Sequence, residues 1–188
     1  MEQRNACELW GLDLTSKQLE AARALLSGSK KHVRLYESPM EENPGIPSGY
    51  FNIVFSIFAI GWTTDLEKTL KNINQYLQLG GSFIFSWEHP LYSRVKNING
   101  TLTFNKSYHE EGPYEHEAWS HTAIMQQFKL STYINALINN GFKVERVIEE
   151  VSLTELDEQK HSNRWYNYEK VQYLPTTLII KSTKIDNL

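Results

Sequence analysis

The sequence predicts an α/β fold in which a mostly parallel sheet carries helices on both faces. Two nearly continuous apolar runs, residues 50–60 and 82–87, are typical of strands buried on both faces of a parallel sheet. Between them, apolar residues recur at the spacing of a helix. A strand, a helix and a second parallel strand in this order form a right-handed crossover, which favours a layered α/β domain.

The first predicted strand is short and ends in a carboxylate. Residues 9–14 read as this strand, with Asp13 near its end, and residues 15–26 read as a helix. Thr15 is expected to cap that helix, with Gln18 at the capping-box spacing. Residues 32–36 alternate in polarity, as expected for a strand. Residues 37–49 contain three prolines and two glycines and are expected to form a loop.

The middle of the chain supplies the helix of the predicted crossover. Thr63 or Thr64 is expected to cap it, and Gly80 is expected to end it. Its apolar stripe consists of four residues: Leu66, Leu70, Ile73 and Leu77.

Residues 88–127 break the pattern, because they are polar, aromatic and rich in histidine. Short strand pieces are expected near residues 102–104 and 123–125. The segment is too long for a plain connection. We therefore predict one domain over residues 1–188 with a lid or insertion at about 89–127. Potential metal ligands are dense in residues 108–121, but their spacing matches no standard zinc pattern, so no metal site is predicted.

The last third of the chain is expected to complete the sheet. Ser131 is predicted to cap a helix that stops at Gly141, and strands are predicted at residues 142–148 and 173–181. Pro175 is expected near the start of the final strand, where a missing N–H is tolerated. The polar residues between these strands, 153–170, are expected to form one helix.

Composition points to a small-molecule partner. The net charge is −3 and basic residues are scattered, unlike the basic patch of a nucleic-acid binder. One cysteine, Cys7, allows no internal disulfide and fits a reducing compartment. No long apolar run or signal peptide pattern is present. We expect a cytoplasmic protein without membrane or nucleic-acid partners, and the sequence leaves homo-oligomerisation open.

Four segments in order carry a family resemblance. They are Trp10-Gly11-Leu12-Asp13-Leu14-Thr15, Phe51-Asn52-Ile53-Val54-Phe55-Ser56, Leu77-Gln78-Leu79-Gly80-Gly81-Ser82-Phe83-Ile84-Phe85-Ser86 and Asn140-Gly141-Phe142. Together they resemble the class I S-adenosylmethionine-dependent methyltransferases over about residues 9–184. The resemblance implies a Rossmann-like sheet, S-adenosylmethionine as cofactor and methyl transfer to a small-molecule acceptor.

The resemblance also implies roles for particular residues. Asp13 would bind the ribose hydroxyls, and Leu14 would pack on the adenine. The other implied cofactor-binding residues are Ser38, Pro39, Met40, Ser56, Ile57 and Phe58. On the substrate side, the implied catalytic candidates are Glu88, His89 and Tyr92. For His89, the residues alone leave two alternatives open, a general base or a hydrogen-bonded loop histidine.

The chain departs from the family pattern at its beginning. Asn52 and Leu79 replace the usual aspartate and proline, and neither is needed for chemistry. Residues 1–8 are too few to supply the family's first strand and the Gly-rich turn that holds the cofactor. In the family's sheet order, 3-2-1-4-5-7-6, that strand is central, so we expect the fold to lack its central strand and the following helix.

This deficit leaves alternatives for the structure and for the function. The flanking strands pair directly, another chain fills the gap, or the polypeptide is a fragment. For function, the alternatives to a methyltransferase are a truncated, catalytically inactive remnant or interaction module, or a binder that retains part of the pocket without turnover.

Overall fold

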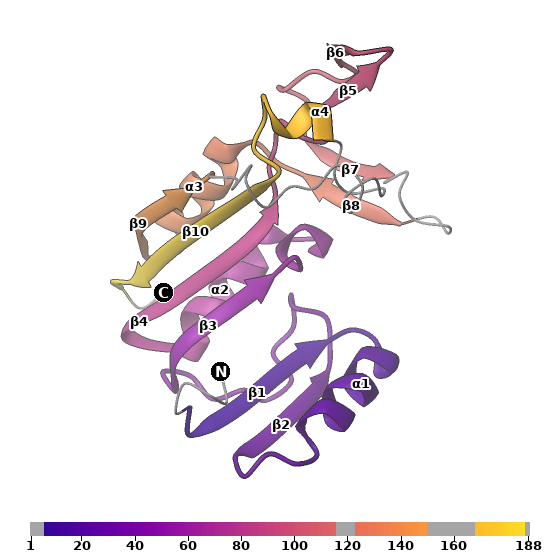
Figure 1. Cartoon of the computed structure of the whole chain (residues 1–188). Coiled ribbons are helices and arrows are strands. Elements are labelled where there is room, and N and C mark those ends of the chain that lie inside the picture. The colour runs from indigo at the N-terminus through magenta and orange to yellow at the C-terminus, as the bar shows by residue number, and fades with distance from the viewer. Residues whose placement is uncertain (1–5, 116–122, 150–167, 187–188) are drawn as a thin grey trace.

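The computed structural model describes residues 6–115, 123–149 and 168–186, and its strands form a two-stranded unit, a neighbouring four-stranded sheet and two hairpins (Figure 1). The smaller unit pairs β1 (Glu8–Asp13) with β2 (His32–Glu37) in parallel. Helix α1 (Ser16–Leu26) connects the two strands and lies against them, with Leu19 buried. This unit confirms the predicted strand, helix and strand at the beginning of the chain.

The larger unit is a four-stranded sheet in the order β3-β4-β10-β9. Its strands are β3 (Phe51–Ile57), β4 (Leu77–Glu88), β10 (Thr177–Lys184) and β9 (Phe142–Ile148). β3 and β4 are parallel, whereas β10 is antiparallel to both of its neighbours. The α/β class and the strand order agree with the sequence prediction, and the sheet is mixed at its far edge.

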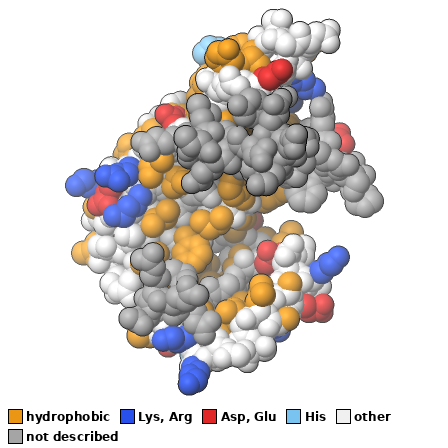
Figure 2. Space-filling view, viewed as in Figure 1, with side chains coloured by type: hydrophobic (Ala, Val, Ile, Leu, Met, Phe, Trp, Pro, Cys, Tyr) orange, Lys and Arg blue, Asp and Glu red, His pale blue; other side chains and the backbone are white. Residues whose placement is uncertain are grey.

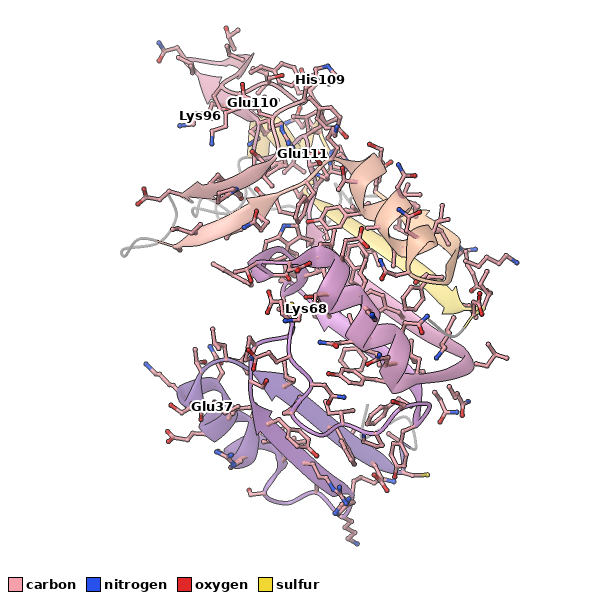
Figure 3. All side chains as sticks on the ribbon, turned by 180° about the vertical axis from the view of Figure 1, so that it is seen from behind. Glu37, Lys68, Lys96, His109, Glu110 and Glu111 are labelled. Atoms are coloured by element: carbon pink, nitrogen blue, oxygen red, sulfur yellow. The ribbon has the colours of Figure 1, made fainter. Side chains whose placement is uncertain are left out.

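Helices lie on both sides of the strands, as predicted. Figures 1 and 3 place α2 (Leu66–Tyr76) and α3 (Leu130–Asn139) on one side and α1 on the other. The core forms where α2 and α3 pack on the four-stranded sheet. Its fully buried members include Leu70, Leu77, Phe83, Leu137, Leu178 and Ile180.

β1 and β3 are neighbours but do not pair. In the described part of the chain, β1 bonds only to β2 and β3 bonds only to β4. Direct pairing of the strands that flank the expected gap, one of the three alternatives, is therefore not realised. An aromatic contact joins the two units instead, since the Trp10 ring lies 5.2 Å from Phe51 and 5.5 Å from Tyr50.

The prediction that residues 50–60 are buried on both faces is wrong. β3 ends at Ile57, and Ile60–Trp62 form a short 3-10 helix. Alternate residues of β3 are exposed, with fractions of 46% for Ile53, 47% for Phe55 and 59% for Ile57. The physical reason is that α2 covers the opposite face of β3, and no helix of the described residues covers the face that carries Ile53, Phe55 and Ile57.

The predicted caps also need correction. The Thr15 side chain does not cap α1, because its hydroxyl and its backbone N–H both donate to Asp13 Oδ1. Asp65, rather than Thr63 or Thr64, caps α2, and its carboxylate accepts the Lys68 N–H at 3.0 Å. Helix α3 begins at Leu130 without a side-chain cap, so Ser131 is not its capping residue.

Two element boundaries differ from the prediction as well. α2 ends at Tyr76, and Leu77 already starts β4, so Gly80 lies within the strand at a φ of 79°. The last strand starts at Thr177, which places Pro175 before it. Most of the predicted helix over 153–170 lies outside the described residues. The described residues at its end belong to α4 (Tyr168–Val171).

The predicted insertion is built from two small hairpins that extend beyond the sheet (Figure 1). One pairs β5 (Val95–Ile98) with β6 (Thr101–Phe104), and the other pairs β7 (Gly112–Glu115) with β8 (Ile124–Gln127). The fully buried Arg94 fixes their base, because its guanidinium donates to backbone carbonyls of Pro90, Ser107 and Glu110.

The charged residues of the insertion lie far from the β1–β2 unit. Figure 3 shows Lys96, His109, Glu110 and Glu111 at one end of the molecule and Glu37 near the other. Among the described residues, no group of three or more His, Cys, Asp or Glu side chains is placed to hold a metal ion. In the same residues, no helix is long and apolar enough to cross a membrane.

Candidate functional site

The carboxyl ends of β1, β2 and β3 form one edge of the strand layer. β1 ends at Asp13, and the Ser38 N–H just after β2 donates to the Asp13 carbonyl at 3.1 Å. β3 ends with Ser56 and Ile57. Open α/β sheets bind ligands beyond the carboxyl ends of their strands, so this edge is a candidate ligand site.

The Asp13 carboxylate is oriented, and half of it is open. Oδ1 accepts hydrogen bonds at 2.8 Å from both the backbone N–H and the hydroxyl of Thr15. Oδ2 accepts none from the described residues. Because the side chain is partly exposed, this second oxygen can receive donors from a ligand such as a vicinal diol.

Apolar side chains stand beside this carboxylate. Leu14 follows it and is 66% exposed. Pro39 and Met40 follow β2, and the Asn72 side chain on α2 donates to the Met40 carbonyl at 3.1 Å. This hydrogen bond to α2 fixes the loop after β2. The carboxyl ends of the strands therefore combine the Asp13 carboxylate with neighbouring apolar side chains.

The end of β3 carries an unsatisfied hydroxyl and a tight turn. Ser56 Oγ is buried and has no hydrogen-bond partner among the described residues. Phe58 follows with a positive φ of 49°, and its N–H donates to the Ser86 carbonyl at 3.0 Å. A buried polar atom without a partner costs free energy, so a ligand atom that bonded to Ser56 Oγ would recover it.

A cleft of about 360 Å³ lies between β1 and β3. Its walls come from both strands and from α2, and they are mostly apolar; Figure 2 shows hydrophobic side chains around this hollow. Three of the predicted cofactor-binding residues line it, namely Met40, Ser56 and Ile57. The other predicted residues, Asp13, Leu14, Ser38, Pro39 and Phe58, lie at its carboxyl-end border rather than on its walls.

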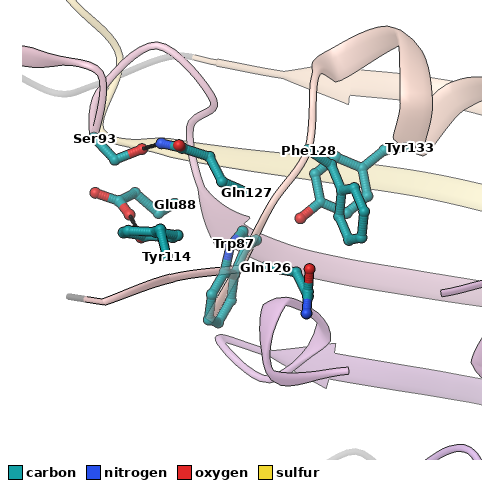
Figure 4. Close-up of a pocket in the computed structure, with 8 residues that line it drawn as sticks. All are labelled: Trp87, Glu88, Ser93, Tyr114, Gln126, Gln127, Phe128 and Tyr133. Carbon is teal, nitrogen blue, oxygen red and sulfur yellow. Dashed lines mark hydrogen bonds between the residues drawn. The ribbon is translucent and has the colours of Figure 1, made fainter. Parts of the chain in front are cut away.

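A second, smaller pocket lies at the end of β4 (Figure 4). Its volume is about 10 Å³, room for roughly one water molecule. The lining residues are Trp87, Glu88, Ser93, Tyr114, Gln126, Gln127, Phe128 and Tyr133. The pocket therefore joins the end of β4 to the β7–β8 hairpin and α3.

Glu88 is the titrating group of this pocket. Burial raises the pKa of its carboxyl to about 7, although the Tyr114 hydroxyl and the positive charge of Lys170 act in the opposite direction. Tyr114 donates to Glu88 Oε2 at 3.0 Å. A carboxyl that is half ionised near neutral pH is suited to accept or release a proton.

Lys170 lies near Glu88 and over Tyr92. Its ammonium is 3.6 Å from the centre of the Tyr92 ring and donates to the Tyr92 carbonyl at 2.5 Å. Burial lowers the pKa of Lys170 to about 8, with Glu88 opposing the shift. Tyr92 itself is 5% exposed, so this predicted substrate-side residue contributes to the packing of the insertion.

His89 is held by both of its ring nitrogens. Nδ1 accepts the Leu91 N–H at 3.2 Å, and Nε2 lies 2.8 Å from Glu149 Oε1. Since Nδ1 accepts, Nε2 carries the proton that is donated to Glu149. This arrangement favours the hydrogen-bonded loop histidine of the two alternatives, because the accepting nitrogen is already occupied.

The Tyr133 hydroxyl lines the small pocket without a partner. It is buried and makes no hydrogen bond to the described residues, while the neighbouring Gln127 donates to Ser93 Oγ at 2.6 Å (Figure 4). The pocket is therefore lined by the Tyr133 hydroxyl, the Glu88 carboxyl and the hydrogen-bonded pair of Gln127 and Ser93.

Comparisons with known proteins agree with this geometry. A family model described as a methyltransferase domain matches residues 1–85. A crystal structure of an S-adenosylmethionine-dependent methyltransferase from Mesorhizobium loti is 27% identical, with a TM-score of 0.78, and covers 97% of this chain and 82% of that one. The first 85 residues thus match a methyltransferase domain, and nearly the whole chain is similar to an S-adenosylmethionine-dependent methyltransferase.

Two further proteins are similar over nearly the whole chain. An uncharacterized protein of Haemophilus influenzae is 26% identical over 197 residues, covering 98% of this chain and 75% of its own length. A structure from Listeria monocytogenes is 24% identical with a TM-score of 0.74, covers 98% of this chain and 83% of that one, and bears on the fold alone.

The strand order fits the methyltransferase family with one position open. Here β2, β1, β3, β4, β10 and β9 correspond to the family order without its central strand. The cleft between β1 and β3 lies at that position. Among the described residues, no Gly-rich turn stands beside Asp13.

Sequence reasoning missed several residues of the two pockets. Trp10, Gly11, Leu12 and Tyr76 line the larger cleft because no strand separates β1 from β3. Tyr114, Gln127 and Tyr133 reach the smaller pocket from elements far from Glu88 in the sequence. In the sequence, these pocket residues were indicated by the density of aromatic and polar residues in the predicted insertion.

Proposed function

We propose that this chain binds S-adenosylmethionine at the carboxyl ends of β1 and β3 and transfers its methyl group to a small-molecule acceptor near Glu88. The observation that carries the proposal is the oriented, half-open carboxylate of Asp13 at the end of β1. The similarity to S-adenosylmethionine-dependent methyltransferases supports this cofactor as the ligand of the carboxylate.

The described residues fit one end of this cofactor better than the other. Asp13 would hold the ribose hydroxyls, Leu14 and Met40 would border the adenine, and the unpartnered Ser56 Oγ would meet a polar atom of the cofactor. No described residue supplies the row of backbone N–H groups that the family's Gly-rich turn directs at the methionine end. We therefore expect weaker binding than in relatives with a complete site.

Glu88 and Tyr114 supply the acid–base chemistry of the proposal. When bound, S-adenosylmethionine provides a methyl group on a sulfonium, which is transferred with cleavage of its carbon–sulfur bond as the acceptor's lone pair attacks. Glu88 would take the proton that an O–H or N–H acceptor loses. Its pKa of about 7 suits this role near neutral pH.

A small acceptor is the substrate class that the pocket supports. The net charge of −3 offers no attraction to a nucleic acid. The pocket beside Glu88 has room for about one water, so it suits a single polar group of an acceptor rather than a large ring.

Calorimetric titration with S-adenosylmethionine and S-adenosylhomocysteine tests the proposal. Wild-type protein should release or absorb heat with a Kd in the micromolar to sub-millimolar range. Asp13→Asn should weaken binding at least tenfold, because it keeps an oxygen for Thr15 but turns the second oxygen into a donor. Glu20→Gln, which neutralises an exposed carboxylate on α1, is the matched control and should bind like wild type.

Two outcomes decide between the alternatives. No heat from folded protein at millimolar ligand would reject the cofactor site and leave the interaction module. Binding without formation of S-adenosylhomocysteine in the presence of any tested acceptor would favour a binder without turnover. The exposed apolar face of β3 is the observation that favours the interaction module.

A further inference from the structure

Lys170 is a buried lysine on α4, which lies beside β5 of the insertion (Figure 1). Its side chain is 9% exposed, so its ammonium has lost most of its contact with water. Burial of a charge costs free energy unless neighbouring groups compensate for the lost hydration. The groups around Lys170 therefore show what its charge does in the fold.

Tyr92 holds the Lys170 ammonium at two points. The ammonium lies 3.6 Å from the centre of the Tyr92 ring, which is close enough for a cation–π interaction. It also donates to the Tyr92 carbonyl at 2.5 Å. Tyr92 is itself fixed, because it is 5% exposed and its N–H donates to the His89 carbonyl at 2.8 Å. The ring and the carbonyl therefore stabilise the charged form of Lys170 and keep it in one place.

The chain that follows α4 returns to the end of β4, where Glu88 lies. The turn after α4 is closed by backbone hydrogen bonds to the Lys170 carbonyl. The His89 N–H then donates to the Thr176 carbonyl at 2.9 Å, and Thr177 pairs with Glu88 in the sheet. These contacts bring α4 close enough for the charge of Lys170 to act on the Glu88 carboxyl.

Other titratable groups on the elements around Glu88 are Tyr114 on β7, Tyr133 on α3, and His89 and Arg94 at the start of the insertion. The two tyrosines keep their protons, because burial raises the pKa of both. The histidine directs Nε2 at Glu149, and the guanidinium donates to backbone carbonyls. Among the described residues, Lys170 is the cation whose charge lowers the Glu88 pKa.

We infer that Lys170 is a positioning residue of the proposed reaction: held by Tyr92, its ammonium stabilises the ionised form of Glu88, which can then take the proton of the acceptor. Burial disfavours an ionised carboxyl, and a protonated carboxyl is no base. In the step concerned, the O–H or N–H bond of the acceptor breaks and its proton bonds to the Glu88 carboxylate. The inference rests on the proposed role of Glu88.

The inference also gives Tyr92 a task. The resemblance to methyltransferases implied that Tyr92 faces the substrate, whereas the structure buries it under Lys170. Tyr92 then acts on Glu88 through the lysine that it holds. The alternative is a purely structural role, in which Lys170 ties α4 to the insertion and its charge has no effect on Glu88.

Carbon-13 NMR titration of the full chain, without cofactor or acceptor, measures the pKa of Glu88, and Glu88→Gln identifies its signal. Lys170→Met keeps the length of the side chain and removes its charge. It should raise the Glu88 pKa by roughly one pH unit, the lower end of the usual effect of a nearby opposite charge. Lys170→Arg restores a positive charge that can lie over the Tyr92 ring, and should return the Glu88 pKa to that of wild type.

Lys181→Met is the matched control. It removes a positive charge from β10, where Lys181 forms an ion pair with Glu145 at 2.8 Å, and that charge is not among those that act on Glu88. The Glu88 pKa should therefore be unchanged. Circular dichroism should show the same folded chain for this variant and for both Lys170 variants, because each substitution preserves the size of the side chain.

Two substitutions of Tyr92 give a second test. Tyr92→Phe keeps the aromatic face under the ammonium, whereas Tyr92→Leu removes it. Nitrogen-15 NMR of the lysine amino groups should show that Tyr92→Leu lowers the Lys170 pKa from about 8, by roughly 0.5–1.5 pH units. Tyr92→Phe should leave it near that of wild type. An equal Lys170 pKa in the two variants would overturn the assignment of Tyr92 as the holder of the charge.

Two further results would overturn the inference. An unchanged Glu88 pKa in Lys170→Met would leave only the structural tie. An equal rise in Lys170→Met and Lys170→Arg would assign the effect to packing rather than to charge. In the reaction itself, the acid limb of the pH profile of kcat/KM should move upward in Lys170→Met and return in Lys170→Arg. The NMR result is independent of methyl transfer, so a failure of this inference is distinguishable from a failure of the proposed function.

Discussion

The hydroxyl of Tyr114 donates a 3.0 Å hydrogen bond to Oε2 of Glu88, and so joins the β7–β8 hairpin of the insertion to the end of β4 (Figure 4). Burial disfavours the ionised form of Glu88, whereas this bond favours it. The protonation state of the pocket therefore depends on whether the insertion is docked. Burial and the negative charge of Glu88 in turn raise the pKa of Tyr114, so its proton stays in place for donation.

We predict that Tyr114→Phe raises the pKa of Glu88 above about 7. The lost bond stabilised the carboxylate, and hydrogen bonds to charged groups contribute roughly 1.5–3 kcal/mol, which corresponds to a rise of about one to two pH units. Carbon-13 NMR titration of the glutamate carboxyl groups measures the shift. Tyr173→Phe is the control, because Tyr173 is 73% exposed. An unchanged Glu88 pKa in Tyr114→Phe would contradict the assigned role of this bond.

Glu88 should also make stability depend on pH. Its pKa rises from 4.5 to about 7 on folding, so the folded state holds the proton more tightly than the unfolded state does. Stability should therefore be highest below pH 4.5 with respect to this group and fall as the pH rises to about 7, by at most about 3 kcal/mol. Other carboxyl groups titrate in the same range, so the comparison is made with Glu88→Gln.

The measurement is urea denaturation of wild type and Glu88→Gln from about pH 4.5 to about pH 8, a range that spans the unfolded and folded pKa values of Glu88. The stability difference between the two proteins should change with pH in the stated direction, because the effects of all other titrating groups are shared and cancel in the subtraction. Parallel curves for the two proteins across this range would show that Glu88 does not titrate there.

The sequence predicted the elements whose signals are local. Asp13 follows an apolar strand and precedes a helix, so its position at the end of β1 follows from pattern alone. The strands 82–87 and 142–148 have equally local causes, and the structure contains them. Three residues of the predicted apolar stripe, Leu66, Leu70 and Ile73, are buried on α2, and the fourth, Leu77, starts β4. The family resemblance placed these elements in their sheet order, which periodicity could not do.

Features that depend on distant contacts were not predictable. The apolar run of β3 resembles a fully buried strand. One of its faces is exposed because no described helix packs there, and a local sequence pattern does not reveal which elements pack on a strand. Tyr114 meets Glu88 from the β7–β8 hairpin, and the base of the insertion that carries this hairpin is held by Arg94. Asp65 caps α2 because the helix begins at Leu66, whereas the hydroxyls of Thr63 and Thr64 lie before the cap position and donate to the distant Glu41.

Adjacent residues of α3 should differ sharply in their effect on stability. Leu137 is fully buried in the core, whereas Ile138 is 55% exposed. We expect Leu137→Ala to lower the free energy of unfolding by about 2–5 kcal/mol, through lost burial and the cavity left behind. Ile138→Ala on the same helix should change it by less than about 0.5 kcal/mol. Chemical denaturation compares the two, and equal losses would contradict the packing of α3 on the sheet.

Gly61 should tolerate no side chain, because Trp87 occupies the space. A Cβ at Gly61 would overlap the Cε2 and Cζ2 atoms of the Trp87 indole, well inside van der Waals contact. The indole is 5% exposed in the core and next to Glu88, so it cannot move away freely. We expect Gly61→Ala to cost about 1–3 kcal/mol, the usual range for overpacking. The displaced indole should also change the tryptophan fluorescence and the pKa of the neighbouring Glu88.

Gly28 provides the control for this substitution. It follows α1, no atom lies within 4 Å of a Cβ built there, and its φ is not positive. Gly28→Ala should therefore be neutral or stabilise the fold by up to about 1 kcal/mol, because alanine restricts the unfolded chain. Thermal unfolding followed by circular dichroism measures both variants. If Gly61→Ala unfolded at the temperature of Gly28→Ala, Trp87 would not be fixed against the 3-10 turn, and the wall that it forms beside Glu88 would have to be mobile.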